Sequence, residues 1–171
     1  MSLTRAIAVA EALLEHDADV HVVDLTTADV PDIERAINTA FGHYGDWVYP
    51  YTEKSSDWTL SKKAVYNGKF AGCYMLAWRS ILDEIQAEKM ESLEDLSQYA
   101  DKKGLEGIAL VVLPEFRNLG IGRALKDATR LLGADYMWGA QLKTLGNLEQ
   151  WLHRRRLVAH NEDMYLTLED L

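Results

Sequence analysis

Cysteine and proline are scarce in this chain, whose 171 residues include one cysteine and three prolines. The single Cys73 excludes an internal disulfide and a cysteine-based metal cluster, which fits a reducing compartment such as the cytosol. Its place in an apolar, strand-like stretch indicates a small core residue. The histidines show no ligand spacing, so the sequence predicts no metal site.

Positive charge and long apolar runs are also limited. Lys and Arg number 18 against 27 Asp and Glu, which gives a formal net charge of −9. Because contacts to phosphates require a basic face, this balance disfavours a nucleic-acid partner and favours a cationic substrate such as an amine. No apolar run approaches the roughly 20 residues that cross a bilayer, so we expect a cytoplasmic protein with no membrane partner.

The hydrophobic pattern alternates between helix and strand periods and predicts one α/β domain over residues 19–171. Residues 1–18 are predicted to form an amphipathic helix that precedes this domain. A strand over 19–25 and a helix over 29–42, with Asp29 as its cap, come first. The other predicted elements are a hairpin around Asn67-Gly68, a short helix over 92–104, a buried strand over 105–113, a helix over 119–133, a strand over 134–142, a last helix over 147–156 and a closing hairpin over 157–168.

The stretch RNLGIG, residues 117–122, lies between the buried strand and a helix. Glycines let backbone N–H groups turn toward a ligand, and the helix N-terminus adds a positive dipole end, so the pattern favours a phosphate site. A dinucleotide fingerprint needs a third glycine where Leu125 stands, and a P-loop needs Gly-Lys-Ser/Thr where Arg123 follows Gly122. A pyrophosphate cradle remains. The alternative is that Gly120 and Gly122 only allow tight packing of the helix on the strand.

The motif Arg117-x-x-Gly120-x-Gly122, within VVLPEFRNLGIGRALKDA, resembles the signature of the GNAT superfamily of acetyl-CoA-dependent N-acyltransferases. From about Val20 onward, the predicted order of elements is also similar to that of the family. The resemblance implies a mixed, mostly antiparallel central sheet flanked by helices, to which the helix over 1–18 is an addition. It further implies acetyl-CoA as the co-substrate and a primary amine as the acceptor.

The resemblance implies a role for each residue that matches the family's pattern. Glu106 stands where one branch of the superfamily carries its general base, the alternative being a solvent-facing carboxylate at the start of a strand. The N–H group of Leu110 would polarise the thioester carbonyl. Contacts to the pantetheine, the phosphates and the rest of the cofactor arm would come from Leu110, Val111, Val112, Arg117, Asn118, Leu119, Gly120, Ile121, Gly122, Arg123 and Asn147.

The general acid is the point at which the sequence departs from the family's pattern. The usual tyrosine of the last helix is absent, because an ungapped comparison places Leu152 at its position. His153 fits a solvated helix face better than an acid, and Tyr165 fits packing on a strand. A CoA thiolate leaves readily enough for solvent to protonate it, so a dedicated acid is not required.

An aromatic-rich stretch, residues 43–58, lies where the family builds its acceptor pocket. It has no clear period and is either a lid or a loosely helical cover of the core. We predict Tyr44, Trp47 and Tyr49 as contacts to the substrate. Three functions stay open: acetylation of a small-molecule amine, the same chemistry on a protein or peptide amine, and non-enzymatic acyl-CoA binding. The oligomeric state is also open, a homodimer included.

Overall fold

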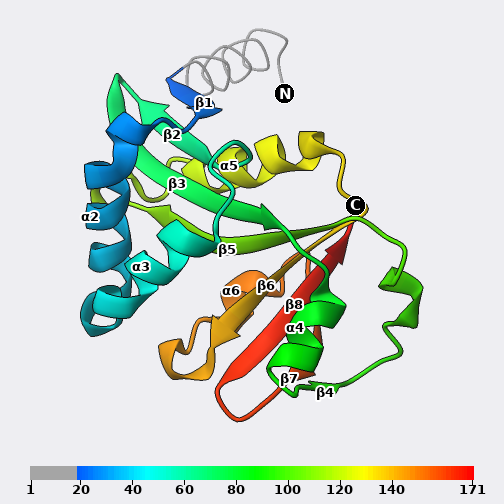
Figure 1. The fold of residues 1–171 in the computed structure, drawn as a ribbon. Helices are drawn as coiled ribbons and strands as arrows, with labels where there is room; N and C mark the ends of the chain where they lie inside the picture. The colour runs from blue at the N-terminus through cyan, green and yellow to red at the C-terminus, as the bar shows by residue number, and fades with distance from the viewer. Residues whose placement is uncertain (1–18) are drawn as a thin grey trace, which may run out of the picture.

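The computed structural model describes residues 19–171, so the helix predicted over residues 1–18 lies outside the described residues. Its strands form one sheet in the order β1-β2-β3-β5-β6-β8-β7-β4 (Figure 1). Neighbouring strands are antiparallel except β5 and β6, which are parallel. The strands are β1 (Val20–Asp24), β2 (Lys62–Tyr66), β3 (Lys69–Trp78), β4 (Glu91–Ser92), β5 (Gly104–Val112), β6 (Tyr136–Leu142), β7 (Arg156–His160) and β8 (Met164–Asp170).

The described α-helices are α2 (Val30–Phe41), α3 (Gly45–Ser55), α4 (Ile81–Ala87), α5 (Ile121–Thr129) and α6 (Leu148–Trp151). Helices α2 and α3 cover one face of β3 and β5, and α5 covers the other (Figure 1). Side chains alternate along β3 accordingly: Cys73 and Met75 pack beneath α2, whereas Tyr74 and Leu76 pack beneath α5. The predicted fold class, a mostly antiparallel sheet flanked by helices, is confirmed.

Helix α4 packs on the other half of the sheet. There Ile81, Trp138 and Leu166 are fully buried in a third core cluster, which also contains residues of β7 and β8. Within residues 19–171, the structure contains no helix with the length and apolar character that crossing a membrane requires.

In the first half of the domain, the end of α2 and the turn between β2 and β3 lie where the sequence predicts them. Helix α2 ends at Gly42, whose φ of 54° is favourable for glycine. The hairpin turn between β2 and β3 has φ values of 48° at Asn67 and 75° at Gly68, as a two-residue turn of this kind requires. Asp29 is the N-cap residue of α2 as predicted, but its side chain makes no capping hydrogen bond, because the carboxylate accepts hydrogen bonds from the Thr26 N–H at 2.7 Å and from Lys63 Nζ at 2.6 Å.

The helix predicted over residues 92–104 is wrong. Glu91–Ser92 forms strand β4, which pairs with β7, and only Ser97–Tyr99 makes a single 3-10 turn. A local contact contributes, because Asp95 Oδ1 accepts a hydrogen bond from the Ser97 N–H at 2.9 Å and so competes with helical hydrogen bonding. The α-helix of this region is α4, which begins earlier and was not predicted.

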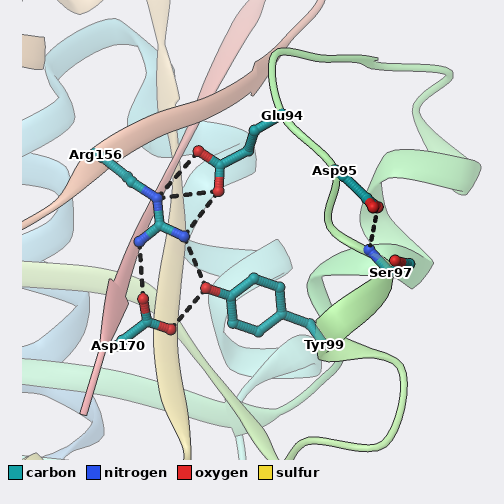
Figure 2. Close-up of polar contacts among 6 residues, drawn as sticks. All are labelled: Glu94, Asp95, Ser97, Tyr99, Arg156 and Asp170. Carbon is teal, nitrogen blue, oxygen red and sulfur yellow. Dashed lines mark hydrogen bonds and ion pairs between the residues drawn. The ribbon is translucent and has the colours of Figure 1, made fainter.

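Arg156 ties this segment to the sheet through a network of polar contacts (Figure 2). Its Nε and Nη2 atoms donate to Glu94 Oε1 at 3.0 and 2.8 Å, and its Nη1 donates to Asp170 Oδ2 at 2.9 Å. Nη2 also donates to the Tyr99 hydroxyl at 2.7 Å. Because these contacts hold Arg156 at the start of β7, the last helix does not reach residue 156 as predicted, and α6 ends at Trp151.

Candidate active site

Strands β5 and β6 separate along their length. Their parallel pairing joins Gly104–Glu106 to Tyr136–Trp138 and goes no further. On its opposite edge, β5 stays paired with β3 as far as Val112. From Gly107 onward, the edge of β5 that faces β6 therefore has no strand partner, and its backbone groups are available to hydrogen-bond a ligand.

A cavity of about 270 Å³ occupies the gap between the two strands. One wall is β5 from Glu106 to Leu110, and the opposite wall is β6 from Ala140 to Leu142. Side chains of α2, α3 and α4 close one side, and Asn147 and Trp151 also contribute. We call this space the central cavity. Its size is near the lower end of ligand pockets, which hold roughly 300–1,000 Å³.

Glu106 is a buried carboxyl in the central cavity whose pKa is strongly raised. Its residue is 4% exposed, and burial raises its pKa to about 7. Arg79 opposes this rise and Glu84 adds to it. Arg79 Nη2 lies 2.6 Å from Glu84 Oε2, whereas Nη1 lies 3.5 Å from Glu106 Oε2, so the guanidinium is committed mainly to Glu84. A carboxyl with a pKa of about 7 can accept a proton at neutral pH.

The glycine motif forms the loop between β5 and α5. Asn118 and Gly120 have positive φ values of 63° and 77°, and α5 begins at Ile121 without a side-chain cap. The first N–H groups of the helix are therefore available to an anion. A Cβ atom on Gly122 would meet only Val112 Cγ2, at an ordinary contact distance of 3.7 Å. Packing does not require glycine at this position, which favours the cradle over the packing alternative.

Solved structures of other proteins share this fold, although no family model and no curated protein matches the sequence. A GNAT family acetyltransferase from Elizabethkingia anophelis with acetyl-CoA bound has a TM-score of 0.59 at 16% identity, over 90% of this chain and 99% of that chain. Naa50 from Arabidopsis thaliana, in complex with the bisubstrate analogue CoA-Ac-MVNAL, has a TM-score of 0.53 at 13% identity, over 90% and 99% of the two chains. The chain has the GNAT fold. N-acetylglutamate synthase from Neisseria gonorrhoeae, complexed with coenzyme A and N-acetyl-glutamate, has a TM-score of 0.59 at 14% identity, over 89% of this chain and 35% of the longer one.

The GNAT fold brings four predicted site residues to one place, because Glu106, Leu110, Asn147 and Trp47 all line the central cavity. The loop from Arg117 to Arg123 lies beyond the end of the same strand, β5. The Val111 side chain packs beneath α2 and α3, and that of Val112 packs on the α5 side of the sheet. These two residues therefore have only their backbone groups to offer a ligand.

Two of the three predicted substrate contacts do not line the central cavity. Tyr49 is 8% exposed and belongs to the core beneath α2 and α3, and Tyr44 packs against the same core. The cavity is lined instead by Tyr51 and Thr52, together with Trp47. The sequence contains a signal for this grouping, because positions 47 and 51 are four apart and share one face of a helix, with 52 beside 51, but it applies only once residues 45–55 are known to be helical.

The two side chains considered as general acid, His153 and Tyr165, lie outside the central cavity, and so does Leu152, which stands at the position of the usual tyrosine. Leu152 is 39% exposed, and Tyr165 on β8 has the Lys143 amine 4.7 Å from its ring centre. His153 lines a second cavity, of about 200 Å³, formed by α5 and the residues around α6. The nearby Arg155 is buried, donates from Nη2 to the Tyr74 hydroxyl at 2.9 Å and lies over the Trp151 ring.

Proposed function

We propose that this protein is an N-acetyltransferase that moves the acetyl group of acetyl-CoA to a primary amine of a small molecule. The observation that carries the proposal is the position of Glu106, a buried carboxyl with a pKa of about 7, in a cavity between two separated strands. An open phosphate cradle at the end of the same strand supports it. So does the fold, since solved structures that share it contain acetyl-CoA or coenzyme A.

The residues present fit acetyl-CoA, which supplies an activated acetyl group. N–H groups from Asn118 to Gly122 would hold the pyrophosphate, and Arg117 and Arg123 would reach the outer phosphates. Asn147 lines the central cavity, and its buried Oδ1 has no hydrogen-bond partner within residues 19–171, so it could accept a hydrogen bond from an amide of the cofactor arm.

In the proposed reaction, two groups of β5 have different tasks. The N–H of Leu110, on the unpaired edge of the strand, would donate a hydrogen bond to the thioester carbonyl oxygen as negative charge develops on it. Glu106 would accept a proton from the incoming alkylammonium, directly or through water, because only a neutral amine can attack.

The small volume of the central cavity favours a small amine over a peptide. Trp47 and Tyr51 of α3 line the central cavity, whose volume is about 270 Å³. A peptide would need an open groove to accommodate residues on both sides of the reacting amine. N-acetylglutamate synthase and Naa50, which share the fold, were solved with a small amino-acid derivative and with a peptide-based analogue, so the fold by itself is compatible with either acceptor.

Acetyl-CoA is expected to raise the melting temperature by roughly 5–10 °C at one hundred times its dissociation constant, because it binds only the folded chain. NAD and ATP, which lack a matching motif, are expected to cause little change. Thiol release from acetyl-CoA is then measured with a panel of small amines and with a short peptide. Release that depends on a small amine supports the proposal. A larger shift with NAD would contradict it, and binding without release from any amine would indicate a binding module.

Trp47→Ala is expected to raise the KM for the amine by about fivefold or more while changing the KM for acetyl-CoA less than twofold. The indole is 50% exposed and lines the acceptor side of the central cavity, so its loss removes a contact to the amine without removing core packing. Trp47→Phe, which keeps an aromatic ring, is the matched control, and its KM for the amine is expected to lie between those of the wild type and Trp47→Ala. Equal increases in both KM values would show that Trp47 has a structural role.

A further inference from the structure

The charged residues that line the central cavity are all acidic. Glu84 and Glu88 come from α4 and its C-terminal end, and Glu106 comes from β5. Among the described residues that line this cavity there is no lysine, arginine or histidine. The nearest compensating charge is Arg79, which lies beside Glu84 and Glu106. The cavity is thus suited to an acceptor with more positive charge than one reacting amine supplies.

The three carboxylates are not equivalent. Glu106 is the proposed base, and Glu84 is paired with Arg79 at 2.6 Å. Glu88 is exposed and, within residues 19–171, has no cationic side chain within ion-pair distance. It follows Glu84 by one helical turn; burial raises the pKa of Glu84, and the negative charge of Glu88 adds to that rise. A cation placed at Glu88 would relieve this repulsion.

A buried hydroxyl and an apolar wall complete the site. Thr52 is 1% exposed and lines the central cavity, and its Oγ1 atom has no hydrogen-bond partner among the described residues, so a ligand N–H could satisfy it. Ile108, Ala109 and Leu142 line the same cavity with aliphatic groups, which suit a methylene chain. Carboxylates and an unpartnered hydroxyl with an aliphatic wall fit a chain that carries an amine at each end.

We propose that the acceptor is an aliphatic α,ω-diamine, whose reacting amine lies at Glu106 while its second ammonium group binds at Glu88. The inference rests on the proposed function. In the reaction one C–N bond forms and the C–S bond of the thioester breaks. The reacting ammonium loses two protons, of which one passes to Glu106 and then to solvent and the other ends on the sulfur of free CoA. The second ammonium keeps its protons throughout.

Three substrates with the same number of carbon atoms test this assignment: 1,4-diaminobutane, 1-aminobutane and 4-aminobutanoate. They carry the same reacting amine and differ at the fourth carbon, which bears an ammonium group, is a methyl group or is a carboxylate. With saturating acetyl-CoA, kcat/KM is expected to be about tenfold higher for the diamine than for 1-aminobutane, after correction for its two equivalent amines. It is expected to be lower again for 4-aminobutanoate, and the preference should weaken at high salt.

Glu88→Gln tests the residue. It is expected to lower kcat/KM for 1,4-diaminobutane by about five- to tenfold and to affect 1-aminobutane much less, because only the diamine carries the second charge. Glu91→Gln, a nearby exposed glutamate on β4 outside the central cavity, is the matched control and should leave all three values unchanged. Equal losses on diamine and monoamine in Glu88→Gln would overturn the assignment.

Binding provides a readout that is independent of turnover. Titration calorimetry at pH 8 is expected to show 1,4-diaminobutane binding to the wild type about five- to tenfold more tightly than to Glu88→Gln, with 1-aminobutane binding weakly to both. The two proposals fail in different ways. If no amine releases thiol from acetyl-CoA, the acetyltransferase function is wrong. If thiol is released but the monoamine is used as well as the diamine, the acetyltransferase function stands and the diamine inference is wrong.

Discussion

Glu106→Gln is expected to lower turnover near neutral pH by roughly 10²–10⁴-fold, the usual range for loss of a general base. The amide keeps the shape and polarity of the carboxyl but cannot accept the proton of the incoming ammonium. The affinity for acetyl-CoA should change little, because the proposed phosphate cradle lies beyond the other end of β5. Single-turnover rates and an acetyl-CoA titration of both proteins measure the two effects separately.

The pH dependence identifies the group responsible. In the wild type, the rate should rise with pH through about 7, where Glu106 loses its proton. Glu106→Gln should lack this limb, and its deficit should shrink at high pH, where more of the amine is already neutral. Identical rates and identical pH profiles for the two proteins would show that the amine is deprotonated in solvent, and that Glu106 is only a carboxylate at the start of a strand.

The raised pKa of Glu106 also has a consequence for stability. A carboxyl whose pKa rises on folding from 4.5 to about 7 holds its proton more tightly in the folded state. The wild type should therefore lose free energy of unfolding as pH rises from about 4.5 to 7, relative to Glu106→Gln, and the difference should be constant above this window. Up to about 3 kcal/mol is expected at pH 8 in favour of the variant, and urea unfolding at pH 5 and pH 8 measures it.

Gly122→Val is expected to weaken acetyl-CoA binding at least a hundredfold while leaving the protein folded. The protein itself has room for the first added carbon, since a Cβ atom would meet only Val112 Cγ2 at 3.7 Å. The space that this side chain fills is the space in which backbone amides would approach a pyrophosphate. Thermal melting with and without acetyl-CoA, together with circular dichroism, separates lost binding from lost folding.

A matched control for this substitution lies on the same helix. Ala128→Val introduces the same β-branched side chain near the C-terminal end of α5, away from the glycine loop, and should retain the acetyl-CoA shift. Gly122→Ala, with one added carbon, should give an intermediate loss. If Gly122→Val binds acetyl-CoA as tightly as the wild type, the cradle is not at this loop.

Sequence patterns predicted the elements whose signals are local. Helix α2 has an apolar stripe and a glycine stop, the β2–β3 hairpin has Asn67-Gly68, and β5 and α5 flank the glycine motif. The segment after α4 was mispredicted because its conformation depends on distant partners. Arg156, which lies 62 residues beyond Glu94 in the chain, holds that segment in place, and no local pattern contains this contact.

The candidate site shows the same limit. Glu106 and Asn147 were predicted from the resemblance to the GNAT superfamily, and both line the central cavity. Glu84, by contrast, enters the site on a helix that the sequence analysis did not assign. Tyr49 was chosen in place of Tyr51 because residues 43–58 were treated as aperiodic, and in the helix that forms there positions two apart point in different directions.

The short pairing between β5 and β6 divides the sheet into two halves that are joined over a short distance. Three residue positions on each strand join the half-sheet of β1, β2, β3 and β5 to the half-sheet of β6, β8, β7 and β4. Glu106 is the last residue of β5 that pairs with β6, so the proposed base lies where the two half-sheets begin to separate. A ligand held in the gap would contact both half-sheets. Part of its binding free energy would then stabilise one separation between β5 and β6.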